Sequence, residues 1–190
     1  MPLTLQREIS MMVYGIFLPA LPTERTRDLK IERKNGKLTL SDLQCGCEYN
    51  HVMPQMDIYI REGLIESVVD CVAEAGLGRR GLIVCDANTY RVAASKVQQK
   101  LADAGFDTKL CMLPGEHVEP TEEMVGLIRG QADEAEFLLS VGSGVITDLT
   151  RRSASLMDKP FAVFGTAASM DGYTSITSSM MIGGIKISKY

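Results

Sequence analysis

The strongest constraint on the fold lies in the stretch from Phe137 to Ser175. Residues 137–141 are apolar except for Ser140, and Gly142-Ser143-Gly144 follows them directly. Apolar residues then recur at about helical spacing, which predicts a strand, a tight turn and a helix. The first amides of a helix have no acceptor within it, and the helix dipole is positive there, so this turn suits a phosphate group. We call it the glycine turn, and its candidate ligand-binding residues are Gly142, Ser143, Gly144, Val145 and Ile146.

A second loop of small and hydroxyl-bearing residues follows the next apolar run, Phe161 to Phe164. We call residues 166–175 the serine–threonine loop. In an open parallel sheet, loops that leave neighbouring strands at their carboxyl ends line a common crevice. We therefore expect this loop beside the glycine turn. The hydroxyls of Thr166 and Ser169 are suited either to bind a ligand or to cap the next segment. Asp171 is suited either to accept substrate hydroxyls or to form an ordinary turn.

Each feature taken alone has a simpler explanation. The glycine turn is not a complete GxGxxG motif, because Thr147 stands at the third glycine position. Asp86 follows the apolar run 81–85 and is suited to hold both hydroxyls of an adenosine ribose, but an acid at a helix start explains it as well. Asp148 is expected to tie its helix to nearby loops. The two loops together favour a nucleotide site.

The rest of the chain alternates between strand and helix patterns. Strands are predicted at 57–60, 81–85 and 108–113, with helices near 64–72, 88–101 and 120–130. Such alternation predicts an α/β fold with a mostly parallel sheet and flanking helices. Gly183-Gly184 predicts a C-terminal β-hairpin within 176–190. We expect a dinucleotide-binding α/β domain over residues 51–190.

Residues 1–50 are expected to form a partly ordered N-terminal extension. Asn35-Gly36 is a favourable turn pair for one short hairpin. The apolar run from Met11 to Pro22 is too short to span a bilayer, and we expect it to belong to a loosely attached segment. The sequence gives no reason to expect a membrane partner.

Charge and cysteine content exclude several other classes. The net charge of −4 gives no support to nucleic-acid binding, and the short basic clusters, Arg79-Arg80, Arg151-Arg152 and Lys30 to Lys37, are expected to be solvated. The five cysteines are expected to be reduced thiols in a cytoplasmic protein. Cys45, Cys47 and His51 lack the usual zinc spacing, so we predict no metal site in this chain.

The sequence VGSGVITDLTRR, followed by GTAASMDGYTS, resembles the sn-glycerol-1-phosphate dehydrogenases. These belong with glycerol dehydrogenases, iron-containing alcohol dehydrogenases and dehydroquinate synthases, and the resemblance covers roughly residues 57–190. It implies a Rossmann-like N-terminal domain of the dehydroquinate synthase type, and an NAD(P)-dependent enzyme that interconverts glycerol-1-phosphate and dihydroxyacetone phosphate.

The resemblance also implies roles for individual residues. The glycine turn would bind the dinucleotide pyrophosphate, and Asp86 would bind the adenosine ribose. Asp171 would bind the substrate hydroxyls. The nicotinamide half would lie against the following residues: Thr166, Ala167, Ala168, Ser169, Ser175 and Lys186. Asp86 would repel a 2′-phosphate, which favours NAD over NADP without deciding between them.

Two departures from that family limit what is expected of this chain. Gly165 stands where the family usually has proline. The family's helical domain, which supplies an aspartate and two histidines for zinc, nickel or iron, is absent from these 190 residues. We therefore expect no catalytic residue in the chain, no turnover by it alone, and a homo-oligomer formed through exposed apolar surface. A non-catalytic dinucleotide-binding module and a dehydroquinate synthase-like enzyme remain alternatives.

Overall fold

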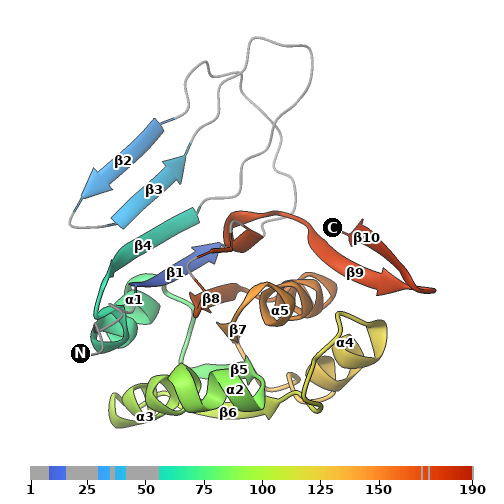
Figure 1. Ribbon diagram of the computed structural model, residues 1–190. Helices are drawn as coiled ribbons and strands as arrows, with labels where there is room; N and C mark the ends of the chain where they lie inside the picture. Colours follow the sequence, from blue (N-terminus) through green and yellow to red (C-terminus); the bar gives the residue numbers. More distant parts are fainter. Residues whose placement is uncertain are drawn as a thin grey trace, which may run out of the picture.

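The protein is an α/β structure built around one eight-stranded sheet, with helices on both faces (Figure 1). The computed structural model describes residues 9–15, 30–34, 37–41, 56–167, 169–170 and 172–189. The strand order is β2-β3-β4-β1-β8-β7-β5-β6. A separate two-stranded sheet, β10-β9, lies at the C-terminal end of the sequence.

Four parallel strands form one half of the large sheet. Their bounds are β5 (Arg80–Cys85), β6 (Asp107–Met112), β7 (Phe137–Gly142) and β8 (Phe161–Gly165). All residues of β7 and β8 are buried, because helices cover both faces. The predicted α/β class is confirmed, with a sheet that is parallel over these four strands.

Helices α1 and α3 cover one face of the parallel strands, and α4 and α5 cover the other (Figure 1). Two hydrophobic clusters result, and side chains of β7 alternate between them: Leu139 and Val141 pack with α3, and Leu138 packs with α5. The helical bounds are η1 (Leu64–Ser67), α1 (Val68–Glu74), α2 (Ala87–Thr89), η2 (Tyr90–Ala94), α3 (Ser95–Asp103), α4 (Glu122–Arg129) and α5 (Gly144–Leu156).

The other half of the large sheet is antiparallel and comes from the N-terminal part of the chain. Its strands are β1 (Ile9–Gly15), β2 (Lys30–Lys34), β3 (Lys37–Ser41) and β4 (Met56–Glu62). Strand β1 pairs with β4 on one side and with β8 on the other. The loose attachment expected for the run from Met11 is therefore wrong for residues 11–15, because this apolar strand pairs along the flank of β8 that would otherwise be an open edge.

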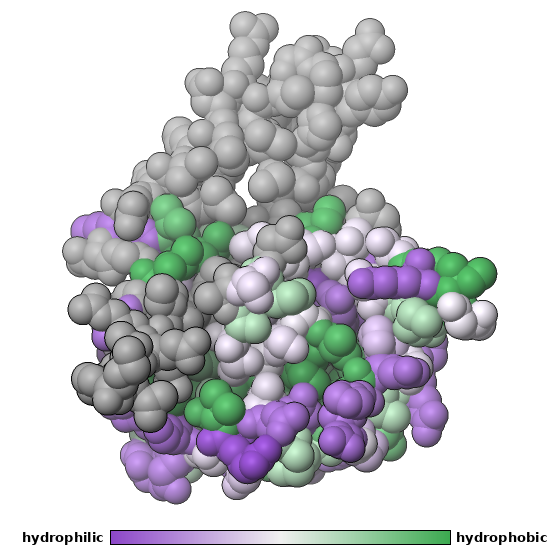
Figure 2. Space-filling view, in the orientation of Figure 1, coloured by the Kyte–Doolittle hydropathy of each residue, from purple (hydrophilic) through white to green (hydrophobic). Residues whose placement is uncertain are grey.

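The two predicted hairpins are confirmed. Strands β2 and β3 pair with Lys34 opposite Lys37, which brackets the expected turn pair. Strands β9 (Ser178–Ile182) and β10 (Ile185–Lys189) flank two glycines with positive φ, as a tight hairpin turn requires. Figure 2 shows hydrophobic colour at the outer end of this hairpin, where Ile182 and Ile185 are exposed. None of the helices in the described residues is both long and apolar enough to cross a membrane.

The order of the parallel strands creates a topological switch point between β5 and β7. The chain passes from β5 outward to β6 and then returns to the other side of β5 to form β7. The connections that leave β5 and β7 therefore run to opposite faces of the sheet. Ligands of open α/β sheets bind at the carboxyl ends of the strands at such a point.

Candidate functional site

The glycine turn joins β7 to α5 next to this switch point. Gly142 ends β7, and Ser143 is the N-cap residue of α5. The Ser143 carbonyl accepts the Thr147 N–H at 3.0 Å, which is the first hydrogen bond of the helix. The N–H groups of Gly144, Val145 and Ile146 precede that bond, and the Ser143 side chain makes no cap bond to them. Within the described residues, no hydrogen-bond partner is found for these three amides, so they are candidate donors to a ligand at the positive end of a 13-residue helix.

Both glycines of the turn lie close to neighbouring side chains. A Cβ on Gly142 would lie 2.6 Å from the Cβ of Ile146, an atom fixed to the helix backbone. A Cβ on Gly144 would meet the terminal methyl group of Met170, which comes from the serine–threonine loop. Glycine at position 142 therefore lets β7 run into α5 without a collision with Ile146.

The glycine turn and the serine–threonine loop lie side by side, as predicted. Gly142 is opposite Gly165 in the parallel pairing of β7 and β8. The Thr166 N–H then donates to the Gly142 carbonyl at 3.1 Å, which continues the pairing past the ends of the strands. Met170 adds a side-chain contact at Gly144. The described parts of the two loops are therefore in direct contact.

Tyr173 joins the same two loops, and the sequence analysis missed it. Its hydroxyl accepts the Ala167 N–H at 3.2 Å and lies 3.1 Å from the Ala167 carbonyl and 3.4 Å from the Gly142 carbonyl. Burial raises the pKa of Tyr173. A Cβ on Gly165 would come within 2.8 Å of its ring, which explains why glycine occupies this position. The only sequence indication was an aromatic residue within a loop of small ones.

Arg151 is the largest fully buried side chain among the described residues, which contradicts its expected place on a solvated face. Its guanidinium donates to the carbonyls of Gly172 at 2.8 Å, Tyr173 at 3.1 Å and Thr177 at 3.0 Å. It also donates to the Asp148 carboxylate at 2.8 Å. These acceptors replace the water that burial removes from the two terminal nitrogens, whereas Nε has no hydrogen-bond partner in the part of the chain that the structure describes. The arginine thus connects α5 to the serine–threonine loop.

Asp148 connects its helix to neighbouring segments, as expected. Besides Arg151, its carboxylate accepts a hydrogen bond from the Ser179 backbone. Burial raises the pKa of Asp148, while the charges of Arg151 and Lys186 act in the opposite direction. Burial also lowers the pKa of Arg151. Lys186, on β10, is therefore near enough to α5 for its charge to act there.

Asp86 lies at the carboxyl end of β5, across the switch point from the glycine turn. It is the N-cap of α2: its Oδ1 accepts the Thr89 N–H at 2.7 Å, and the Thr89 hydroxyl at 2.9 Å. The Thr89 side chain in turn accepts the Asp86 N–H at 3.0 Å. The interpretation of Asp86 as an acid at a helix start is thus confirmed. The capping bonds fix the carboxylate at the sheet edge, and its role toward a ribose stays a prediction.

The remaining candidate residues are exposed, engaged in local hydrogen bonds, or outside the described part of the chain. Ser169 is exposed, and Lys186 is exposed on β10. The Ser175 hydroxyl is engaged locally, accepting the Thr177 N–H at 3.1 Å and donating to its carbonyl at 3.0 Å. Ala168 and Asp171 lie outside the described residues, and so do Cys45, Cys47 and His51.

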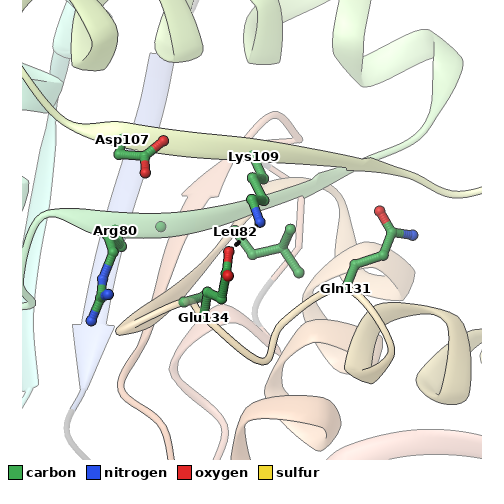
Figure 3. A pocket seen from close by; sticks show the side chains of 8 residues that line it. Arg80, Leu82, Asp107, Lys109, Gln131 and Glu134 are labelled. Atoms are coloured by element: carbon green, nitrogen blue, oxygen red, sulfur yellow. Dashed lines mark hydrogen bonds and ion pairs between the residues drawn. The ribbon is translucent and has the colours of Figure 1, made fainter.

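Two concave regions lie elsewhere on the molecule. One is lined by Arg80, Lys109 and Glu134 at the amino ends of β5 and β6, opposite the switch point (Figure 3). The other, of about 570 Å³, lies between β3, β4 and α1 and includes Lys37, which pairs with Asp57 at 2.9 Å. In the first region Lys109 pairs with Glu134, so both regions contain an ion pair within the protein.

Among the described residues, no group of three or more His, Cys, Asp or Glu side chains is arranged to hold a metal ion. Cys71, Cys85 and Cys111 are buried free thiols, as expected. Burial raises the pKa of Cys85 to about 12 and that of Cys111 to about 11, so both are neutral packing residues at physiological pH.

Comparison with known proteins identifies curated relatives that match most of this chain. The glycerol-1-phosphate dehydrogenase (NAD(P)+) of Halalkalibacterium halodurans is 35% identical over 159 residues, covering 81% of this chain and 39% of the relative. The enzyme of the same name from Methanosarcina mazei is 32% identical over 128 residues, covering 67% of this chain and 35% of the relative. This chain therefore spans less than two fifths of either relative's length.

Solved structures agree at the level of the fold. A probable glycerol dehydrogenase from Sinorhizobium meliloti matches with a TM-score of 0.53 at 20% identity, over 64% of this chain and 31% of that one. The glycerol dehydrogenase of Schizosaccharomyces pombe gives the same values. The family model described as iron-containing alcohol dehydrogenase matches residues 59–189. The chain belongs to the iron-containing alcohol dehydrogenase family.

Proposed function

We propose that this chain is the nucleotide-binding part of an NAD(P)-dependent glycerol-1-phosphate dehydrogenase. The main support is the amino end of α5 at the switch point, where the first three amides have no partner among the residues that the structure describes and could donate to a pyrophosphate. The names of the curated relatives support the choice of substrate, glycerol-1-phosphate, and of cofactor. The reaction of the complete enzyme would interconvert glycerol-1-phosphate and dihydroxyacetone phosphate.

The residues of this chain fit a dinucleotide. Gly144, Val145 and Ile146 would donate to the pyrophosphate, and the carboxylate of Asp86 would accept the hydroxyls of the adenosine ribose. The nicotinamide half would lie along the serine–threonine loop, which borders the glycine turn through the Thr166–Gly142 hydrogen bond. When bound, the nicotinamide supplies the hydride chemistry, and these residues would orient it.

Asp86 favours NAD over NADP in this proposal. A ribose 2′-phosphate would bring a second negative charge next to a carboxylate that its capping bonds hold in place. Asp171 remains the proposed acceptor for the substrate hydroxyls. The divalent metal of the complete enzyme, zinc, nickel or iron, is not assigned to any described residue, and we derive no step through it. A homo-oligomer and a cytoplasmic location also remain predictions.

The test is calorimetric titration of the full 190-residue chain with NADH and with NADPH. We expect NADH to bind more tightly than NADPH, and Gly142→Val to abolish binding because its side chain would collide with Ile146. Gly126→Val is the matched control, since Gly126 on α4 has open space around its missing Cβ and lies away from the turn. Absence of binding in the unaltered chain, or equal loss in both variants, would contradict the proposal.

A further inference from the structure

Tyr173 occupies a point where three pieces of backbone meet. Its hydroxyl accepts the Ala167 N–H after β8, and its single hydrogen is shared between the carbonyls of Ala167 and of Gly142 at the end of β7. The side chain is 2% exposed, and its ring lies against Gly165. A buried hydroxyl with several backbone partners restricts the relative movement of the segments that carry them.

The main chain on either side of Tyr173 is fixed from α5. Arg151 Nη2 donates to the carbonyls of Gly172 and Tyr173, and Nη1 donates to the carbonyl of Thr177. The same side chain is held by Asp148, one turn earlier on α5. The helix whose first turn forms the proposed pyrophosphate site therefore also holds the segment that inserts the tyrosine.

We propose that Tyr173, held in place by Arg151, is a positioning residue that sets the serine–threonine loop against the glycine turn for the nicotinamide half of the dinucleotide. This inference rests on the proposed function, because it assigns the loop to the nicotinamide half. The adenosine half lies with Asp86 and the first turn of α5, whose geometry is set by the Ser143–Thr147 hydrogen bond and the packing of Gly142 on Ile146. Tyr173 should therefore affect one half of the ligand and spare the other.

The test uses Tyr173→Phe in the full chain, with calorimetric titration of NADH and of ADP. The phenylalanine keeps the ring against Gly165 and removes only the hydroxyl. Loss of these hydrogen bonds should raise the Kd for NADH by roughly fivefold to tenfold and change the Kd for ADP less than about twofold. The nicotinamide fluorescence of bound NADH should also move toward that of free NADH.

Tyr59→Phe is the matched control. Tyr59 is also a buried tyrosine, and its hydroxyl donates to Glu74 at 2.8 Å in the antiparallel half of the fold. This variant should leave both Kd values and the fluorescence of bound NADH unchanged. If the Tyr173 hydroxyl had only a structural role, the two tyrosine variants would change NADH binding equally, or Tyr173→Phe would weaken NADH and ADP binding equally.

An NADH Kd of Tyr173→Phe within twofold of the unaltered chain would overturn the inference. So would an equal loss of NADH and ADP affinity, or an equal effect of the two tyrosine variants. If the unaltered chain bound neither NADH nor ADP, the proposed function would fail and this inference with it. Binding by the unaltered chain without the selective NADH loss would overturn this inference alone.

Discussion

Asp86 shows how one carboxylate at the end of a strand serves the local structure and remains at the ligand edge. Its Oδ1 accepts two hydrogen bonds from Thr89, so the start of α2 depends on it. The sequence offered a helix acid and a ribose acceptor as competing explanations. The structure confirms the first without contradicting the second, because a carboxylate has several lone pairs for hydrogen bonding.

Replacing Asp86 by asparagine separates these two roles. The asparagine side chain would still cap the helix, so the free energy of unfolding should change by less than about 0.5 kcal/mol, whereas Asp86→Ala should cost about 1 kcal/mol. Removing the negative charge should raise the affinity for NADPH relative to NADH by roughly fivefold, since about 1 kcal/mol of repulsion is lost. Urea unfolding and titration with both nucleotides measure these effects. An unchanged affinity ratio would exclude Asp86 from the ribose site.

The two glycines of the turn should differ in their tolerance of alanine. A Cβ at Gly142 meets the rigidly held Ile146 Cβ, so Gly142→Ala should lower the free energy of unfolding by about 1–3 kcal/mol. A Cβ at Gly144 meets only the flexible end of Met170, which is partly exposed and free to turn away. Gly144→Ala should therefore cost less than about 1 kcal/mol. Equal costs in urea unfolding would contradict this account of the packing.

Single-residue roles were predictable where they follow from local pattern. The glycine turn, the cap at Asp86 and the buried thiols all depend on nearby sequence. The roles of Arg151 and Tyr173 depend on segments more than twenty residues apart that meet only in the fold. Adjacent arginines normally indicate a solvated helix face, and nothing local marks the carbonyls that bury one of them.

Among the elements, the start of β5 is joined to the segment before β7 by one exposed carboxylate. Glu136 Oε2 accepts the N–H groups of Arg79 at 2.7 Å and Arg80 at 2.9 Å. These hydrogen bonds lower the pKa of Glu136 below its ordinary value, and the bond from the Arg80 backbone contributes most. Ionisation of the Glu136 carboxylate therefore stabilises the folded state.

Stability should depend on pH through this carboxylate. A lowered pKa means that its contribution is present above the ordinary glutamate pKa and is lost as pH falls through the lowered value. At about pH 7 the unaltered chain should be more stable than Glu136→Gln, and the difference should shrink toward about pH 3. Urea unfolding at both pH values measures this, with Glu116→Gln as the control at an exposed glutamate. A difference that does not vary with pH would be inconsistent with the hydrogen bonds described.

At the scale of the whole molecule, the N-terminal strand β1 joins the antiparallel and parallel halves of the sheet. It pairs with β4 over seven residues and with β8 over five. The sequence revealed an apolar run here but not its partners, because periodicity describes exposure and carries no information on strand order. The elements from β4 onward were predictable for the opposite reason: most have a pattern of their own and are bounded by glycine or proline.

Hydrogen exchange tests the position of β1. Amides of residues 9–15 should exchange about as slowly as those of β8, because β1 has a hydrogen-bonded neighbour on both sides. Amides of β2, which forms an edge of the sheet, should exchange faster. Mass spectrometry of peptides from the exchanged chain gives both rates. Exchange of residues 9–15 at the rate of an unstructured peptide would restore the view of a loosely attached segment.

The most direct test of a dinucleotide site at the switch point is a titration of the 15N-labelled chain with NADH, followed by amide NMR. The account predicts the largest shift changes at Gly144, Val145 and Ile146, with further changes at Thr166 and Ala167. Changes centred instead on the pocket at Lys109 and Glu134, or on the cavity beside Lys37, would contradict it.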